Sequence, residues 1–241
     1  MADFITPGYV LADIGTDHGF IPIYLVQEGK VPKALAMDIN EGPLGRADEH
    51  IEEACLTGKI ETRLSDGLEK LCENEAESIL IAGMGGALTV KILSEGKHAL
   101  KGVKELVLSP HTEADTVREF LRETDFVIER EGMVIDAGKY YVVIKAKRMP
   151  DGEGKGVLYT TDKEGIPDGV SLELYNILCI KFGRMLLKEK NGVLKEFLLK
   201  EKNTYSIILG NLISNMTSTG SKRKEEVEEI LKQINVALDI I

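Results

Sequence analysis

Residues 13–19 have the sequence Asp-Ile-Gly-Thr-Asp-His-Gly (DIGTDHG), and they join a strand to a helix. The preceding apolar run from Tyr9 to Ile14 predicts a buried strand, and the segment from Ile21 to Glu28 predicts a helix. A glycine-rich turn at such a junction lets the backbone approach a ligand, whose polar end meets the N–H groups of the loop and the helix dipole. Gly15 and Gly19 do not complete a G-x-G-x-x-G pattern, so the turn does not match the NAD fingerprint.

The alternation of strand and helix continues along the first 150 residues. Strands are predicted at 34–39, 60–65, 78–82 and 105–109, and helices at 42–56, 87–100 and 114–124. Two longer strands, Phe126 to Ile135 and Lys139 to Lys147, follow as a hairpin joined by Asp136-Ala137-Gly138. Regular alternation predicts a doubly wound parallel sheet, and the closing antiparallel hairpin is typical of the Rossmann-like fold of class I methyltransferases.

The remainder of the chain has a different pattern. Met149 to Gly169 is rich in glycine and predicts a linker or an exposed excursion of the chain. Apolar residues at helical spacing from Phe182 to Leu212 predict one long amphipathic helix, and Val227 to Ile241 predicts a second after the loop Met216 to Ser221. Two such helices are expected to form an antiparallel coiled-coil hairpin. We therefore expect an α/β cofactor-binding domain at 1–150, and a linker with an all-α coiled-coil domain at 151–241.

Polar and glycine residues follow four of the predicted strands. Open α/β sheets bind ligands at the carboxyl ends of their strands, and an acidic residue about 20 positions after the glycine turn can hold ribose hydroxyls. Asp38 is in that position, and a carboxylate at Asp66 is suited to an adenine amino group. The residues expected to bind the cofactor are Asp13, Gly15, Thr16, Asp17, Gly19, Asp38, Asp66, Gly67 and Gly83.

Several segments resemble the TrmK family of bacterial tRNA (adenine-22-N1)-methyltransferases. They are ADIGTDHGFIPIYLV (12–26), LSDGLE (64–69), IAGMGGALTVKIL (81–93), LVLSPHTEADTVREFL (106–121) and GVSLELYNIL (169–178). The resemblance covers nearly the whole chain, and AGMGG is its most specific part. It implies a class I methyltransferase domain, a helical coiled-coil domain that helps to hold tRNA, and methylation of adenine N1 in the D-arm region. Family members normally begin with a further helix, and this sequence starts at about the end of it.

The resemblance also implies the cofactor, and the other roles are hypotheses drawn from the positions of the residues in the sequence. The cofactor would be S-adenosyl-L-methionine, leaving S-adenosyl-L-homocysteine as the product. Asp17 and His18 are the candidate catalytic carboxylate and imidazole, and the alternative is that they only shape the loop or cap the next helix. Expected to contact the substrate are Met84, Gly85, Gly86, Lys188 and Lys195. His111 is another candidate at the edge of the site, whereas His50 and His98 are expected on the surface. The aromatic residues nearest the strand ends are Phe20, Tyr24, Tyr140 and Tyr141, and any one of them is a candidate to stack on the extruded base.

The composition of the chain limits the classes of protein to which it can belong. The net charge of −10 by itself disfavours nucleic acid, but Tyr175 to Tyr205 carries seven basic and three acidic residues, which is compatible with RNA. No apolar run is long enough for a membrane span, and the N-terminus lacks a signal-peptide pattern. Three widely spaced cysteines without a C-x-x-C pair indicate a reducing cytoplasm and no metal site. We expect a cytoplasmic monomer with tRNA as partner and no obligate protein partner.

Two other functions are compatible with the same residues. One is a methyltransferase on this scaffold that acts on another RNA, a protein or a small molecule. The other is a non-catalytic protein that binds the cofactor or RNA. The basic helix favours RNA over a small acceptor, and the glycines of the turn with the acidic pair Asp38 and Asp66 favour a working cofactor site over a relic.

Overall fold

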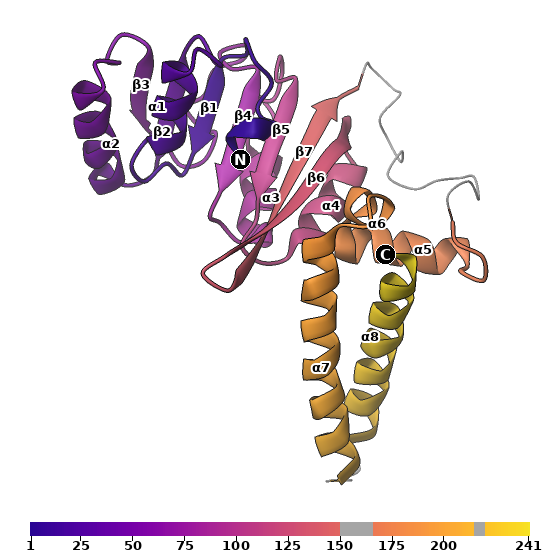
Figure 1. The fold of residues 1–241 in the computed structure, drawn as a ribbon. Coiled ribbons are helices and arrows are strands. Elements are labelled where there is room, and N and C mark those ends of the chain that lie inside the picture. Colours follow the sequence, from indigo (N-terminus) through magenta and orange to yellow (C-terminus); the bar gives the residue numbers. More distant parts are fainter. Residues whose placement is uncertain (150–165, 215–219) are drawn as a thin grey trace. The chain divides into compact units, whose positions relative to one another are not determined.

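The computed structural model describes residues 1–149, 166–214 and 220–241 (Figure 1). Most of the predicted linker and the predicted loop between the last two helices therefore lie outside the described residues. The chain divides into two compact units, Met1–Glu131 with Tyr141–Leu158, and Gly132–Tyr140 with Tyr159–Ile241.

A mixed sheet organises the first unit, and within the described residues it has seven strands in the order β3-β2-β1-β4-β5-β7-β6. Its strands are β1 (Leu11–Ile14), β2 (Ala34–Asp38), β3 (Ile60–Leu64), β4 (Ser78–Ala82), β5 (Glu105–Ser109), β6 (Phe126–Asp136) and β7 (Lys139–Arg148). The first five pair in parallel, and β7 pairs antiparallel to β5. This topology confirms the predicted methyltransferase version of the doubly wound fold.

The burial of the strands explains their sequence patterns. Every residue of β1 and β5 is buried, as expected of parallel strands that are covered on both faces. The strand β3 lies at the edge of the sheet and is buried only at Ile60. Continuous apolar runs therefore mark the central strands, and mixed polarity marks the edge.

The helices α1 (Phe20–Gln27) and α2 (Glu41–Glu53) connect β1 to β2 to β3, whereas α3 (Gly86–Glu95) and α4 (Ala114–Arg122) follow β4 and β5. Right-handed crossovers that run in opposite directions from the centre of the sheet place these two helix pairs on opposite faces. The strand order reverses between β1 and β4, which is the topological switch point where such sheets bind ligands.

A buried ion-pair network holds the N-terminal segment to the sheet. The carboxylate of Glu105, at the start of β5, accepts hydrogen bonds from Thr6 N at 2.9 Å, Thr6 Oγ1 at 2.5 Å and Ser78 Oγ at 2.9 Å. The Lys145 ammonium lies 3.1 Å from the same carboxylate and donates to Thr6 Oγ1 at 2.7 Å. Glu105 is fully buried, so its charge is compensated by this lysine and these donors.

The second unit is helical. It contains α5 (Leu172–Leu178), a π-helical turn (Cys179–Gly183), α6 (Arg184–Lys188), α7 (Gly192–Ser214) and α8 (Gly220–Ile240). The prediction of one continuous helix from Phe182 to Leu212 is wrong, because the helix is interrupted at residues 189–191. Lys190 adopts a left-handed φ of 51°, and Asn191 Oδ1 accepts from the N–H groups of Val193 and Leu194 at 3.0 Å each. The apolar residues therefore keep helical spacing across the break, although Asn191 ends the continuity of the backbone by capping a new helix.

The helices α7 and α8 run antiparallel side by side (Figure 1). Their buried residues include Leu194 and Leu198 on α7, and Val227, Ile234 and Ala237 on α8. The predicted pairing of two amphipathic helices is therefore present, while coiled-coil geometry stays a prediction. None of the helices in the described part of the chain is long and apolar enough to cross a membrane.

The tip of the β6–β7 hairpin belongs to the second unit. Tyr140 donates from its hydroxyl to Glu196 Oε1 at 2.9 Å, and its ring lies edge-on to Phe197 at a centroid distance of 5.3 Å. The Lys200 ammonium lies 5.2 Å from the same ring. A domain boundary at residue 150 stays a prediction, since it falls outside the described residues.

Removal of the Glu105 carboxylate is expected to destabilise the protein. Glu105→Ala leaves the ammonium of Lys145, whose side chain is 10% exposed, without its nearest counter-charge and frees the donors of Thr6. We expect a loss of about 3–5 kcal/mol in the free energy of unfolding, measured by urea denaturation. The control is Glu73→Ala, which removes an exposed pair with Lys101 and should cost about 1 kcal/mol or less. Equal losses in the two variants would contradict the structural role of this network.

Candidate active site at the carboxyl ends of the parallel strands

The DIGTDHG loop bends over the end of β2. The N–H groups of Gly15 and Thr16 both donate to the carbonyl of Met37, at 2.7 and 3.0 Å, which extends the pairing of β1 with β2 beyond the last strand residue. Gly15 has a φ of +79°, a conformation that L side chains rarely adopt. The loop ends at Gly19, which precedes the first residue of α1. The backbone of the turn is therefore held at the switch point of the sheet.

Met84, which follows β4, packs directly on Gly15. A Cβ atom at Gly15 would collide with the terminal methyl group of Met84. The loops after β1 and β4 are thus in contact across the switch point, and only a glycine leaves room for this contact. The sequence predicted both residues in the site but did not predict that they touch.

Asp13, at the base of the loop, is a buried carboxyl. Burial raises its pKa from 3.8 to about 6, a hydrogen bond with Thr16 lowers it, and the charge of Asp38 raises it further. The neighbouring Thr16 is also buried. Asp13 therefore carries a negative charge at neutral pH at a cost in stability, which is typical of a group retained for a ligand.

Asp17 and His18 are brought together with a residue that sequence reasoning missed. The Asp17 carboxylate forms an ion pair with Arg46 on α2, and His18 Nε2 lies 3.3 Å from Asp17 Oδ2. The hydrogen bond from Arg46 is the main reason that the pKa of Asp17 lies below its usual range. This carboxylate is therefore ionised at neutral pH and suited to stabilising positive charge rather than to accepting a proton.

Three rings gather next to this ion pair. The ring of Phe20 lies parallel to that of His18 at a centroid distance of 5.0 Å, with planes 7° apart, and it also stacks on His50 at 4.9 Å. His50 Nδ1 lies 3.0 Å from the His18 carbonyl. The expectation that His50 is a plain surface residue is wrong, because its ring packs against the loop. His98 is exposed, as expected.

The second and third strands end in the predicted acidic residues. Asp38 closes β2, and its Oδ1 accepts from Asn40 N at 2.7 Å and from Asn40 Nδ2 at 3.2 Å. Both bonds use the same oxygen, and Oδ2 has no hydrogen-bond donor among the described residues. Asp66 lies just past β3 and is exposed. Both side chains are placed to accept hydrogen bonds from a ligand at this edge of the sheet.

The segment after β4 pairs with the segment after β5. His111 N donates to the Met84 carbonyl at 2.8 Å, and Gly86 N donates to the Thr112 carbonyl at 2.9 Å. A Cβ atom at Gly83 would lie 4.0 Å from His111 Nε2. The His111 ring meets Tyr141 edge-on at a centroid distance of 5.6 Å. The predicted residues His111 and Tyr141 are therefore in contact with each other, and His111 lies beside Gly83.

The predicted substrate residues fall in both units. Gly85 precedes α3 and Gly86 is its first residue, where a Cβ atom would collide with the backbone carbonyl of Glu113. Lys188 ends α6 and Lys195 lies on α7, and both are exposed in the helical unit. Met84, Gly85 and Gly86 thus gather with the cofactor residues, and the two lysines form part of another unit.

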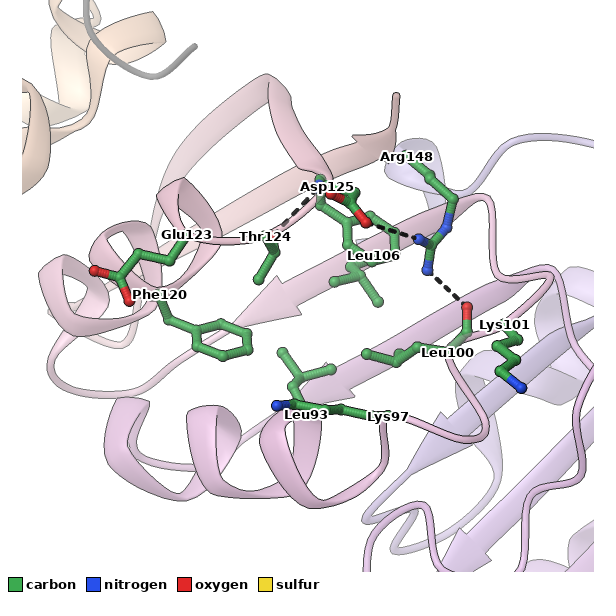
Figure 2. Close-up of a pocket in the computed structure, with 11 residues that line it drawn as sticks. Leu93, Lys97, Leu100, Lys101, Leu106, Phe120, Glu123, Thr124, Asp125 and Arg148 are labelled. Carbon is green, nitrogen blue, oxygen red and sulfur yellow. Dashed lines mark hydrogen bonds and ion pairs between the residues drawn. The ribbon is translucent and has the colours of Figure 1, made fainter. Parts of the chain in front are cut away.

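A pocket of about 500 Å³ lies near the start of β5 and β6 and the end of β7, between the last turns of α3 and α4 (Figure 2). Leu93, Leu106 and Phe126 form its apolar floor. Arg148 donates to the carbonyls of Leu100 and Val103 at 2.7 and 2.8 Å. The pocket is at the amino ends of the strands, away from the glycine loop.

These features fit an adenosyl cofactor. The β1 turn offers a close backbone approach, and carboxylates stand at the ends of β2 and β3, where ribose and adenine groups are bound in such folds. In the described part of the chain, no group of three or more histidine, cysteine, aspartate or glutamate side chains could hold a metal ion.

Comparison with known proteins identifies the family. Residues 1–144 match the family model for a methyltransferase domain. The whole chain aligns with 94% of the tRNA (adenine(22)-N(1))-methyltransferase of Bacillus subtilis (strain 168), at 34% identity. This chain belongs to that family.

Solved structures agree with this assignment. The crystal structure of the B. subtilis m1A22 tRNA methyltransferase TrmK has a TM-score of 0.82 and 31% identity, over 98% of this chain and 95% of that chain. M. capricolum TrmK in complex with S-adenosyl-homocysteine has a TM-score of 0.78 and 27% identity, over 100% and 95%. The predicted family and fold are confirmed, and the roles of individual residues stay predictions.

The contact between Gly15 and Met84 predicts a sharp effect of one methyl group. Gly15→Ala is expected to displace the Met84 side chain and the turn, and to weaken binding of S-adenosylhomocysteine at least tenfold, as measured by calorimetry. The control is Gly138→Ala, because Gly138 has a similar φ of +77° with open space around it. It should cost about 1 kcal/mol of stability and leave binding unchanged. Unchanged binding in Gly15→Ala would refute the assignment of this turn.

The raised pKa of Asp13 predicts that its replacement by asparagine stabilises the protein by an amount that depends on pH. As pH rises from 3.8 to about 6, the unfolded chain loses the Asp13 proton while the folded chain keeps it, so stability is lost over this range. Asp13→Asn removes this titration. At pH 7.5 its free energy of unfolding is expected to be about 3 kcal/mol higher than that of the original chain. This difference in the free energy of unfolding should shrink as pH falls from 6 towards 4. Urea denaturation at pH 7.5 and at pH values down to 4 measures it. A difference that is independent of pH would contradict a raised pKa.

Proposed function

We propose that this chain transfers the methyl group of S-adenosyl-L-methionine to N1 of adenine 22 in tRNA. The observation that carries the proposal is the full-length 34% identity with the B. subtilis enzyme of that name. The residues at the carboxyl ends of β1 to β4 support it, because their glycines and carboxylates suit the binding of an adenosyl cofactor.

The chemistry makes modest demands on the protein. Bound S-adenosyl-L-methionine supplies an electrophilic methyl group on a sulfonium, and in-line attack by the N1 lone pair forms the N–C bond while the electrons of the C–S bond stay on sulfur. Adenine N1 is neutral and needs no base, and its product ring is cationic. The chain must therefore orient the base, free it from its pairing partner and tolerate positive charge.

The loops after β1 to β4 would divide the binding of the cofactor among them. The turn formed by Gly15, Thr16 and Gly19 supplies close backbone approach, and Asp13 supplies a buried negative charge at its base. Asp38 is assigned to the ribose hydroxyls, and Asp66 with Gly67 to the adenine. Gly83 leaves the end of β4 open beside them.

The acceptor adenine would enter beside the segment after β4. Met84, Gly85 and Gly86 are assigned to its floor, with His111 and Tyr141 at the edge. This segment has backbone carbonyls and no amide or carboxylate side chain, so the exocyclic amino group of adenine would donate to the backbone. Lys188 and Lys195 are assigned to tRNA phosphates, which position an RNA without selecting its sequence.

Asp17 and His18 are assigned to the reacting centre. The ion pair with Arg46 keeps Asp17 negative, and His18 is held between that carboxylate and the Phe20 ring. A fixed carboxylate there would favour the positive charge that develops on the adenine ring. Its role is electrostatic, in agreement with its lowered pKa.

We further propose that the protein acts in the cytoplasm as a monomer. Its cysteines Cys55, Cys72 and Cys179 are all free thiols, which suits a reducing compartment. One chain contains both the candidate active site and the helical unit with its basic segment Tyr175 to Tyr205. Light scattering of the free protein at micromolar concentration tests the monomer.

Methyl transfer to unmodified tRNA tests the proposed function. The protein is incubated with S-adenosyl-L-methionine and a tRNA transcript, and the nucleosides are analysed by mass spectrometry. We expect 1-methyladenosine, and we expect its loss when adenine 22 is replaced by guanine. Asp17→Asn and His18→Ala are each expected to lower kcat about 10²-fold or more, because both groups act only when charge develops.

The matched control is Asp115→Asn, which removes an exposed carboxylate near the start of α4 that, within the described residues, accepts a hydrogen bond only from the N–H of Thr116. Its kcat should equal that of the original chain. Methylation at another tRNA position would reject the assigned acceptor while keeping the enzyme class. Full activity in both Asp17→Asn and His18→Ala would reject their catalytic assignment.

A further inference from the structure

Phe20 has an exposed ring beside the candidate active site that cofactor binding does not explain. It is the first residue of α1, and it is 61% exposed although its side chain is large and apolar. It follows the glycine loop directly. Its ring is ordered against His18 and His50, at centroid distances of 5.0 and 4.9 Å. The ring is therefore held in place without being part of the core.

The geometry of the three rings leaves one face of Phe20 open. His18 and His50 lie 5.4 Å from each other, so the three centroids form a nearly equilateral triangle. If the two imidazoles lay on opposite faces of the Phe20 ring, the distance between them would be roughly twice the distance from either one to that ring. Both imidazoles therefore lie towards the same side of the ring, in agreement with its exposure. The opposite face can receive another flat ring.

The charge around the cluster selects the kind of ring. The helix α2, which supplies His50, carries five acidic residues and a single arginine, Arg46. Arg46 is already paired with Asp17. A phosphate group would be repelled here, because no unpaired arginine or lysine of α1 or α2 faces it, whereas a nucleobase offers a neutral π-face. Aromatic and histidine side chains are the usual partners on which unstacked RNA bases are placed.

We infer that the open face of Phe20, backed by His18 and His50, is a stacking platform for an unpaired nucleobase of the substrate tRNA. This inference rests on the proposed function and adds a base-binding position to it. The base is the target adenine or a nucleotide next to it, and both sources share the same stacking chemistry. Phe20 is thereby a substrate-binding residue, and His50 is a positioning residue that orients it.

The chain provides a matched control. Tyr24 lies one turn further along α1, is 50% exposed, and has no ring contact among the described residues. Replacing Tyr24 by leucine removes an exposed aromatic from the same helix without touching the three rings. Replacing Phe20 by leucine keeps a good helix former at an exposed position, so the fold is expected to survive.

The test measures tRNA methylation kinetics and S-adenosylhomocysteine affinity for Phe20→Leu, Phe20→Tyr and Tyr24→Leu. Stacking of a base on an aromatic ring predicts a roughly 5- to 150-fold higher KM for tRNA in Phe20→Leu. Its affinity for S-adenosylhomocysteine should stay unchanged, Phe20→Tyr should restore the KM, and Tyr24→Leu should resemble the original chain. An unchanged KM in Phe20→Leu, or equal effects in Tyr24→Leu, would overturn the platform.

A second measurement does not depend on turnover. Transcripts carry the fluorescent base 2-aminopurine at position 21, 22 or 23, and stacking quenches its emission. Quenching by the original chain that is lost in Phe20→Leu supports the platform, and the quenched position identifies the base. Quenching at none of the three positions overturns it. If the original chain binds tRNA with quenching yet transfers no methyl group, the proposed function fails and the platform stands.

Discussion

The contact between Gly15 and Met84 is the constraint on which the site depends. The loops after β1 and β4 meet at the point where the strand order reverses, and the Met84 methyl group occupies the space that any side chain at Gly15 would need. The same β4 loop is bonded to the loop after β5 through the His111 N–H. The turn after β1 is in addition tied to the end of β2 through the carbonyl of Met37. Three loops and the end of β2 are thereby fixed relative to one another by backbone hydrogen bonds and one side chain.

Buried charge has two distinct roles in the first unit, which contains the sheet. Glu105 and Lys145 compensate each other inside the sheet, and together they hold the N-terminal segment. Asp13 is buried without such a cation, and its pKa is raised to about 6 by that burial. The first arrangement stabilises the fold, whereas the second costs stability at neutral pH. A carboxylate kept at such a cost at the base of a ligand loop is consistent with a role in binding.

Helix and strand positions in the first unit followed from the sequence because its strands are buried on both faces, and their apolar runs are bounded by glycine and polar residues. The helical unit was harder. Its apolar spacing continues across residues 189–191, yet Asn191 caps a new helix there and Lys190 takes a left-handed conformation. Periodicity records which side chains face inward, and it does not record whether the backbone between them is continuous. A local side-chain hydrogen bond decided that point.

The sequence by itself determined the fold class, the family and the strand ends where the candidate site lies. The glycines and acidic residues of that site directly follow the apolar strand segments, so a local pattern identifies them. Only the tertiary structure decided which side chains meet. Arg46 and His50 lie on α2, some 30 residues after the loop that they contact, and nothing in their own segment distinguishes them from surface residues. Their contacts with Asp17 and His18 arise because consecutive right-handed crossovers place α1 and α2 on one face of the sheet. Such contacts depend on packing between elements, which no local pattern encodes.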